Sequence, residues 1–386
     1  MDYSRIDTEF AELYNYRDLS SAVGPDRIKP GRLARCCNPM TGSFEDIERL
    51  VSGLGTRTIV DLRDATEADT VPDNGGLLYS FATADEHGDT EGAEFVAAEG
   101  RTRYVLGGGV SKFANMGEMR AEKEKMQANW KAHGAVVAMQ QMDFTVMYRT
   151  MLGGMGELWL EALKLCADPL RQPLVFHCTA GRDRTGLLAM LVLHVCGATE
   201  AEILDDYVLS KCLAPAEGLY AKPFGFSEGQ VAHFEEQGFP ATQDATDEML
   251  GKIERSDMES VLRWVEAEWG GLDGYLDAIG FDAAQRAALR EACAEEPTEG
   301  AEAAAGKPLT GFGPTEGAPA FGKEWAELSP RERRACRTLG WSEESWEEGD
   351  ESPLEQAWEG LSRRQQTAAT VLGYEAEDFE GPAARL

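Results

Sequence analysis

The ten residues HCTAGRDRTG, at positions 177–186, decide the expected fold because they join two segments of different character. The run before them, QPLVFHC (172–178), is short and apolar, which is typical of a strand buried in a sheet. The run after them, TGLLAMLVLHVCG (185–197), has the length of a buried helix, and Gly197 is placed to end it. The stretch therefore predicts a strand, a tight loop and a helix, in that order.

The loop between this strand and this helix has the composition of an anion-binding site. Cys178 ends the strand and Thr185 opens the helix, so the backbone N–H groups between them can turn inward, and Gly181 allows the tight turn. Such a concave set of N–H groups binds the oxygens of a phosphoryl group and stabilises a cysteine thiolate. The predicted phosphate-binding residues are Thr179, Ala180, Gly181, Arg182, Asp183 and Arg184.

Three side chains of the loop are predicted to carry covalent chemistry. Cys178 is the expected nucleophile, and Arg184 is placed to bind two phosphate oxygens with its planar guanidinium group. Thr185 is expected to donate a hydrogen bond to the sulfur and to help it leave when water attacks the phosphocysteine. The spacing His-Cys, five residues, Arg-Thr resembles that of the cysteine-dependent phosphatases, whereas rhodanese-type sulfur transferases lack the Arg-Thr pair. The alternative is a buried structural cysteine in a chance match.

A general acid must lie within hydrogen-bond reach of the leaving oxygen. The chain has no Trp-Pro-Asp sequence, which supplies this acid in better-known tyrosine phosphatases. Asp183, between two arginines of the loop, is the first candidate, and its alternative role is to tie the loop to the body of the domain. Asp143 and Asp168 are the reserve candidates.

Composition and charge exclude several classes of protein. The chain has 386 residues, 43% of them hydrophobic, which is enough for a large domain and a smaller unit. Its net charge of −31 argues against binding to nucleic acid or to anionic membranes. The N-terminus lacks the features of a signal peptide, and the longest apolar stretch, 187–198, is too short to cross a membrane. Eight cysteines without metal-ligand spacing predict a cytoplasmic protein with no metal and no cofactor.

The catalytic domain is expected over residues 1–295. GTRTIVDLR (55–63) predicts a second buried strand, and helical patterns surround both strands, so we expect an α/β fold with a mostly parallel central sheet flanked by helices. Residues 85–138, rich in Gly, Glu, Lys and Met, predict a helical insertion. It is either a lid over the site or a solvated surface helix.

The C-terminal part is predicted to be a small α-helical repeat module. Residues 296–322 are rich in Gly, Pro and Ala and are interpreted as a linker, and residues 323–382 contain two tandem repeats. The repeated positions are Trp325, Leu328, Ser329, Leu339, Gly340, Trp341 and Trp346, followed 33 residues later by Trp358, Leu361, Ser362, Leu372, Gly373, Tyr374 and Phe379. Two copies should pack on each other and on a further surface, which is either the catalytic domain or a protein partner.

Residues 10–292 resemble the atypical tyrosine phosphatase family that includes secreted bacterial enzymes acting on phosphotyrosine and phosphoinositides. The resemblance rests on the loop and on four further motifs: NYRDLSS (15–21), PGRL (30–33), DLR with a glutamate at 67 (61–67) and YR (148–149). It also covers the tail EWGGLDGYLDAIGFDAAQRAALR. The resemblance implies the fold, hydrolysis of phosphate monoesters and a broad substrate range.

Two departures from the family pattern affect the pocket. Ser20 and Ser21 stand where the family has two glycines, and Arg182 stands where it has a lysine. An arginine keeps the charge, but its larger head alters the mouth of the pocket, so substrate preference does not follow from the resemblance.

A second set of residues is expected behind the loop. Asp61 and Arg63, at the end of the second strand, either contact substrate or form an ion pair that supports the loop. Asn15, Arg17 and Asp18 are expected to support the residues that touch substrate, and His177 to fix the loop backbone. A disulfide between the adjacent Cys36 and Cys37 is not expected, because neighbouring cysteines rarely form one without strain.

These observations favour a phosphatase acting on phosphotyrosine in proteins, with phosphoserine and phosphothreonine as further candidate substrates. The first alternative is a phosphoinositide or soluble inositol phosphate phosphatase, which Arg182 beside Arg184 supports and the acidic body opposes. The second is a scaffold that binds phosphate groups without turnover. The intact Cys178, Arg184 and Thr185 argue against such a scaffold, since binding alone needs no nucleophile.

Overall fold

A computed structural model describes most of the expected catalytic domain and parts of the repeat module. The described residues are 1–68, 70–71, 77, 81–84, 90–91, 101–294, 323–328, 332–333, 335–336, 339, 341, 343–347, 368–369 and 372–374. The predicted linker, residues 296–322, lies outside the described residues.

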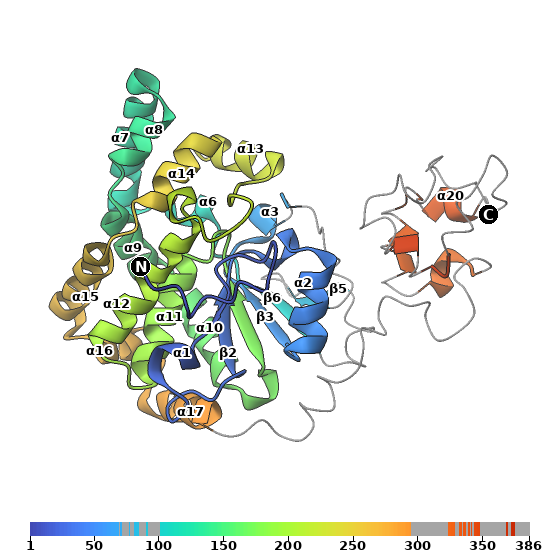
Figure 1. The fold of residues 1–386 in the computed structure, drawn as a ribbon, viewed down its shortest axis with the longest axis horizontal. Coiled ribbons are helices and arrows are strands. Elements are labelled where there is room, and N and C mark those ends of the chain that lie inside the picture. The colour runs from blue at the N-terminus through green and yellow to red at the C-terminus, as the bar shows by residue number, and fades with distance from the viewer. Residues whose placement is uncertain are drawn as a thin grey trace.

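The centre of the catalytic domain is a mixed sheet with the strand order β1-β2-β7-β3-β6-β4-β5 (Figure 1). The strands are β1 Arg17–Asp18, β2 Leu33–Cys36, β3 Thr58–Asp61, β4 Ala82–Ala84, β5 Thr90–Glu91, β6 Thr102–Val105 and β7 Leu174–His177. The pairs β2–β7, β7–β3, β3–β6 and β6–β4 are parallel, and only the outer pairs β1–β2 and β4–β5 are antiparallel among the described strands. The predicted α/β fold with a mostly parallel sheet is confirmed.

Helices cover this sheet (Figure 1). The α-helices are α1 Ser20–Val23, α2 Phe44–Glu48, α3 Ala65–Ala68, α6 Val110–Phe113, α7 Gly117–His133, α8 Ala135–Gln140, α9 Phe144–Gly154, α10 Gly156–Ala167, α11 Asp183–Val195, α12 Glu200–Val208, α13 Glu228–Glu236, α14 Gln243–Gly251, α15 Arg255–Trp269, α16 Leu272–Ala278, α17 Ala283–Ala294 and α20 Glu343–Glu347. The short 3-10 helices are η1 Pro39–Thr41, η3 Pro169–Arg171, η4 Leu209–Leu213, η5 Pro215–Glu217 and η6 Trp325–Glu327, and η2 Arg49–Gly53 is a π-helix. Within the described ranges, no helix combines the length and the apolar composition needed to cross a bilayer.

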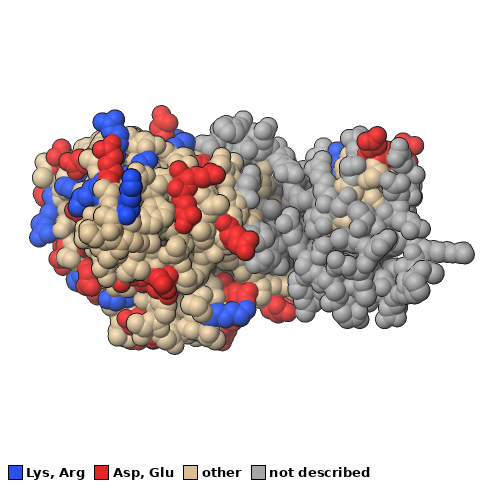
Figure 2. Space-filling model, turned by 90° about the horizontal axis from the view of Figure 1, so that it is seen from above, with Lys and Arg blue, Asp and Glu red and all other residues tan. Residues whose placement is uncertain are grey.

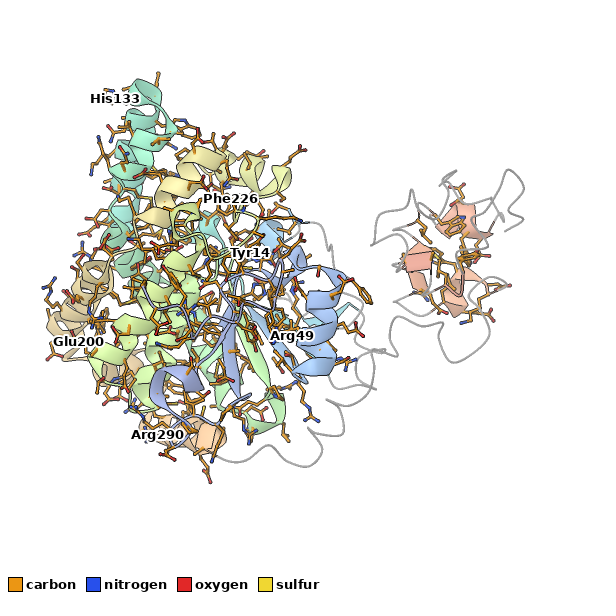
Figure 3. The ribbon with its side chains drawn as sticks, in the orientation of Figure 1. Tyr14, Arg49, His133, Glu200, Phe226 and Arg290 are labelled. Atoms are coloured by element: carbon orange, nitrogen blue, oxygen red, sulfur yellow. The ribbon has the colours of Figure 1, made fainter. Side chains whose placement is uncertain are left out.

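Alternate residues of the central strands enter two different cores. Phe176 of β7 packs with the long helices α9 to α11, whereas its neighbour Val175 packs with the N-terminal segment. The same alternation separates Val60 from Ile59 in β3. Because successive strand residues point to opposite faces, both faces of the sheet are buried, as the apolar strand sequences predict. In Figure 3, Tyr14 of the N-terminal segment lies inside this arrangement.

The strand, loop and helix predicted around residues 177–186 are confirmed, with one difference in the helix boundary. Helix α11 begins at Asp183, two residues before the predicted Thr185, and the amide of Gly186 donates to the carbonyl of Arg182 at 2.7 Å. The helix ends as expected at Gly197, whose φ of 81° allows its amide to bond the carbonyl of His194.

The segment expected to be a helical insertion, residues 85–138, also contributes to the central sheet. Its residues Thr102–Val105 form β6, which lies between β3 and β4. The helical part starts at Val110 with α6 and continues through α7 and α8. Residues 85–89 and 92–100 lie outside the described residues.

The described residues of the two C-terminal repeats bury their side chains in one common cluster. Trp341 of the first copy and Tyr374, at the equivalent position of the second, stack with their ring centroids 6.3 Å apart. Leu339 and Leu372 are also equivalent and both buried. The repeated serines Ser329 and Ser362 lie outside the described residues, and a partner for the module stays a prediction.

Candidate active site

The loop from Cys178 to Arg182 lies at the carboxyl ends of the parallel strands, between β7 and α11, and Asp183 and Arg184 form the first residues of the helix. Cys178 is 2% exposed. Gly181 has a φ of 67°, and a Cβ on it would lie 2.1 Å from the carbonyl oxygen of Cys36. The turn therefore requires glycine both for its conformation and for its close approach to β2.

Polar side chains behind the loop bind its carbonyl groups. Asn15 Nδ2 donates to the oxygens of Gly181 at 3.0 Å and of Ala180 at 3.3 Å. Arg35 Nη2 donates to the same Gly181 oxygen at 2.8 Å. Because these carbonyls are held from behind, the loop keeps the orientation in which its N–H groups can face an anion. Asn15 itself has a positive φ of 59°, which asparagine tolerates better than most residues.

Asp206 on α12 orients the residues that hold the loop. It accepts hydrogen bonds from Arg17 at 2.8 Å and from Arg35 at 2.6 Å, and Arg17 also donates to Asn15 Oδ1 at 2.6 Å. Burial alone would raise the pKa of Asp206, but the charges of Arg17 and Arg35 hold it well below its usual value. Burial and the neighbouring Arg17 lower the pKa of Arg35 to about 10. The bond from Arg17 therefore orients the Asn15 side chain behind the loop.

The predicted phosphate-binding arginine is held by a glutamate in a fork-to-fork pair. Arg184 Nη1 and Nη2 donate to Oε2 and Oε1 of Glu67, both at 2.8 Å, and Nη1 also donates to the carbonyl of Gly108 at 2.8 Å. Nη2 lies 3.5 Å from Thr179 Oγ1, a long contact. One N–H of Nη2 is used on Glu67; the edge made by Nε–H and the second N–H of Nη2 has only that long contact within the described residues. Two phosphate oxygens match such an edge.

The electrostatics of this pair keep both groups charged. Burial alone would raise the pKa of Glu67, yet the neighbouring Arg184 lowers it below its usual value. Burial likewise opposes the charge of Arg184, and Glu67 raises the pKa of the guanidinium above its usual value. Glu67 also accepts from Thr179 Oγ1 at 2.6 Å and from the amide of Val110 at 3.2 Å. The glutamate thus joins the loop, α3 and α6.

The first candidate for the general acid has two donors on one oxygen. Tyr148 Oη on α9 donates to Asp183 Oδ1 at 2.7 Å, and Arg182 Nε donates to the same oxygen at 2.8 Å. Arg182 also donates to the carbonyl of Met249 at 2.8 Å, and its guanidinium lies 4.7 Å from the ring centroid of Phe144. Asp183 keeps 17% of its side chain exposed.

The hydrogen bond expected of Thr185 is not formed, whereas His177 bonds the loop backbone. Thr185 Oγ1 is buried and has no hydrogen-bond partner within the described residues, so the expected bond to the Cys178 sulfur is not formed in this structure. His177 Nδ1 lies 2.9 Å from the carbonyl of Cys178, which fits a role in fixing the backbone. Burial lowers the pKa of His177 to about 4, so its ring is neutral near pH 7.

Asp61 and Arg63 form an ion pair below the loop. Arg63 Nη2 and Arg103 Nη2 each lie 2.7 Å from Asp61 Oδ2, and His177 Nε2 lies 3.6 Å from it. Asp61 and Arg63 are both 0% exposed. Of the two roles considered for this pair, the geometry favours support. Asp18, in contrast, binds the amides of Ser20 and Gly31 at the edge of the sheet.

A small cavity of about 90 Å³ has Cys178 in its lining. Asp183 and Arg184 line it, and most of its wall is apolar: Met139, Phe144, Met147, Phe226, Phe234 and Met249 are among the lining residues. The reserve acids Asp143 and Asp168 do not line it; each caps a helix, through the amides of Thr145 and Leu170 respectively. The cavity therefore combines a polar floor with an apolar wall.

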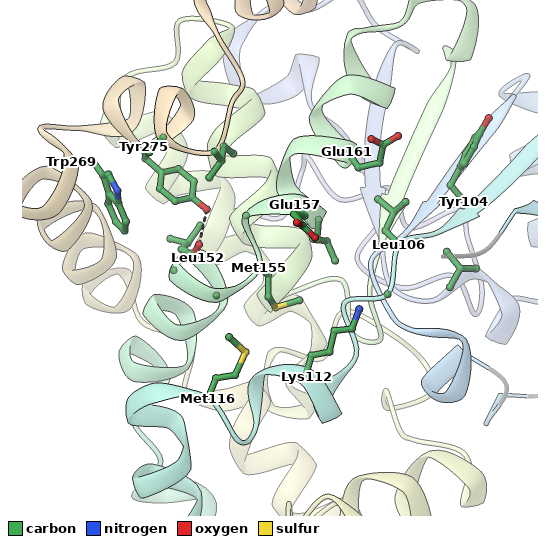
Figure 4. Close-up of a pocket in the computed structure, with 18 residues that line it drawn as sticks. Tyr104, Leu106, Lys112, Met116, Leu152, Met155, Glu157, Glu161, Trp269 and Tyr275 are labelled. Carbon is green, nitrogen blue, oxygen red and sulfur yellow. Dashed lines mark hydrogen bonds between the residues drawn. The ribbon is translucent and has the colours of Figure 1, made fainter. Parts of the chain in front are cut away.

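A wider cavity of about 1180 Å³ opens between β6, the α9–α10 junction and α16 (Figure 4). Trp269, Tyr275 and Lys112 line it, and Tyr275 Oη donates to the carbonyl of Leu152 at 2.8 Å. None of the predicted site residues lines this cavity. The smaller cavity at Cys178 is therefore the candidate active site.

Several residues of the site were not assigned a role from the sequence. Glu67 and Tyr148 stood in motifs of the resemblance, while Arg35 and Asp206 had no signal in the sequence. A buried arginine within a strand such as β2 requires an acidic partner, and this is the only hint that sequence reasoning could have used. Within the described residues, no group of three His, Cys, Asp or Glu side chains could hold a metal ion.

The fold and the loop define the class of protein as a phosphatase, and comparison with known proteins gives the family. The tyrosine phosphatase family matches residues 8–295, so the chain belongs to this family. A putative tyrosine-protein phosphatase of Cupriavidus necator is 29% identical over 285 residues, covering 73% of this chain and 87% of that protein. A tyrosine-protein phosphatase of Nostoc commune is 28% identical over 38% of this chain and 51% of its own. A triple specificity protein phosphatase of Mycobacterium tuberculosis is 24% identical over 72% of this chain and 95% of its own.

Proposed function

We propose that the protein hydrolyses phosphotyrosine in proteins through a phosphocysteine intermediate on Cys178. The observation that carries the proposal is the cavity at Cys178, which joins the free edge of Arg184 to an apolar wall that suits an aromatic ring. Phosphoserine and phosphothreonine are included as further candidate substrates, since one relative is named a triple specificity protein phosphatase. All eight cysteines are free, which favours the reducing environment of the cytoplasm as its location.

The proposed reaction has two steps. In the first, the Cys178 thiolate attacks phosphorus, the S–P bond forms, and the P–O bond to tyrosine breaks while Asp183 gives its proton to the leaving oxygen. In the second, water attacks phosphorus, the S–P bond breaks, and the proton of the water passes to Asp183. Arg184 and the loop amides bind the phosphoryl oxygens in both steps. The buried hydroxyl of Thr185 is available to the sulfur as it leaves.

The neighbourhood of the loop gives less support to a phosphoinositide substrate. Arg182, the extra cation beside Arg184, is already bound to Asp183 and to the carbonyl of Met249. Lys252 is bound to three backbone carbonyls, those of Met139, Gln140 and Met142. Additional phosphate groups need additional cations, and acidic and basic side chains are interspersed on the face drawn in Figure 2.

Phosphate release from a phosphotyrosine peptide and from phosphoinositide vesicles, at low and at moderate salt, tests this proposal. We expect faster turnover of the peptide with a shallow salt dependence, and no turnover by the Cys178→Ser variant. Faster hydrolysis of the vesicles with a steep loss in salt would favour the lipid alternative. If the unaltered protein binds the substrates but does not turn them over, the alternative of a phosphate-binding scaffold would be favoured.

The proposal includes movement of α8. A cavity of about 90 Å³ is well below the roughly 300 Å³ at which ligand pockets begin, and Met139 and Met142, in and after α8, form part of its wall. Lys252, at the end of α14, donates to the carbonyls at the end of α8 at 2.6–3.2 Å. We infer that these bonds keep α8 over the cavity, so that the segment acts as a lid when they break.

Replacing Lys252 with methionine is expected to lower KM for the phosphotyrosine peptide by about threefold to tenfold, because a larger fraction of the protein would be open. Steady-state kinetics measures this effect, with kcat staying within about twofold. Lys125→Met, on the exposed part of α7, is the matched control and should leave KM unchanged. An unchanged or higher KM in Lys252→Met would mean that α8 is a fixed wall.

A further inference from the structure

A chain of hydroxyl groups leads from the interior of the domain to Asp183. Tyr148 Oη donates to Asp183 Oδ1 at 2.7 Å, and Tyr207 Oη lies 2.8 Å from Tyr148 Oη. Both tyrosines are buried, with exposures of 1% and 2%. Because the only proton of Tyr148 is used on the carboxylate, Tyr207 must be the donor between the two hydroxyls. The direction of the chain is therefore Tyr207 to Tyr148 to Asp183.

This chain and Arg182 meet on the same carboxylate oxygen. Arg182 Nε donates to Asp183 Oδ1 at 2.8 Å, and no described residue donates to Oδ2. Asp183 lines the cavity at Cys178 and keeps part of its side chain exposed. A carboxylic acid carries its proton on the oxygen that accepts fewer hydrogen bonds. The proton of Asp183 therefore belongs on Oδ2.

We propose that Tyr148 is a positioning residue that selects Oδ2 as the proton-carrying oxygen of Asp183 and stabilises the carboxylate left behind. The inference rests on the proposed role of Asp183 as general acid. In the first step the Oδ2–H bond breaks, the proton goes to the leaving oxygen, and the new charge is shared with Oδ1. In the second step the proton of the attacking water returns to Oδ2.

The hydrogen bond from Tyr148 to Asp183 becomes stronger as Asp183 gives up its proton. A donor binds an ionised carboxylate more tightly than a neutral acid, so Tyr148 favours the state in which the proton has left. This matters most when the leaving oxygen is strongly basic and needs the proton. A leaving group that departs without protonation gains little from Asp183 and hence little from Tyr148.

Kinetics of Tyr148→Phe with a series of aryl phosphates tests the inference. We expect kcat/KM for phenyl phosphate to fall by about tenfold to a hundredfold, with much less change for dinitrophenyl phosphate and with KM little altered. Tyr275→Phe is the matched control, since it removes a buried hydroxyl that bonds the carbonyl of Leu152 at 2.8 Å and lines the other cavity. Vanadate binding and the melting temperature check that each variant is folded.

Asp183→Asn separates failure of this inference from failure of the proposed function. If Asp183→Asn depends steeply on the leaving group while Tyr148→Phe loses the same factor with every substrate, or loses nothing, Tyr148 does not position the proton. If Asp183→Asn itself shows no dependence on the leaving group, Asp183 is not the acid, and the inference falls together with that part of the proposed function.

Discussion

Replacing Arg184 with lysine is expected to lower kcat/KM for phosphotyrosine peptides by about three orders of magnitude. Lysine keeps the charge but cannot bind Glu67 with one edge and two phosphate oxygens with another, which is what the guanidinium geometry allows. A factor of this size corresponds to about 4 kcal/mol of lost transition-state stabilisation. Steady-state kinetics with the peptide, and with para-nitrophenyl phosphate as a second substrate, measures it.

The control for this variant is Arg171→Lys, at a half-exposed position whose guanidinium lies over the ring of Tyr104. Its kcat/KM should match that of the unaltered protein. If Arg184→Lys keeps more than about a tenth of the original kcat/KM, charge alone suffices and the bidentate edge has no special role.

Replacing Glu67 with alanine is expected to lower the free energy of unfolding by about 3–5 kcal/mol, because Arg184 is left as a buried charge without a partner. Thr179 and the amide of Val110 lose their acceptor in the same variant. Glu67→Gln keeps the shape and one acceptor, so a smaller loss is expected. Urea denaturation of the three proteins at neutral pH measures the differences.

The pH dependence of this effect separates charge from packing. Arg184 outweighs the effect of burial and lowers the pKa of Glu67 below its ordinary value of 4.5, so the folded state favours the ionised form. The stabilisation by the charge is therefore complete above about pH 5 and is lost as the pH falls through the lower folded pKa. The gap in stability between the unaltered protein and Glu67→Gln should stay level from about pH 5 to 8 and narrow below about pH 4. A gap that is the same at all pH values would assign the effect to packing.

Part of the fold can be read from the sequence because some strands are apolar throughout. Strand β7 and the interior residues of β3 are buried on both faces of the sheet. Their short apolar runs therefore predicted them as strands. Strands β2 and β6 were not predicted from the sequence, because an arginine interrupts the apolar pattern of each. Arg35 is neutralised by Asp206, 171 residues later, and Arg103 by Asp61. A charge that breaks an apolar pattern is compensated only in three dimensions.

The site likewise has a part that the sequence predicts and a part that it does not. The segment from Cys178 to Arg184 is contiguous, so its spacing carries the information by itself. Glu67 is 117 residues from Arg184, and Tyr148 is 35 residues from Asp183. A single sequence does not show which residues so far apart along the chain come into contact in the folded protein. The pairing of Glu67 with Arg184 and of Tyr148 with Asp183 therefore became visible only with the fold.

The hydrogen bonds that hold the loop from behind have a consequence for how the protein regains activity after denaturation. Asn15 is 166 residues from Gly181, and Arg35 is 146 residues from it. Contacts between such distant positions form late, because closing long chain segments costs entropy before the contact is made. Helices α9 and α11 consist of local contacts and form without them. During refolding, recovery of helical structure will therefore precede recovery of catalysis, and the time between the two reports the docking of the N-terminal segment onto the loop.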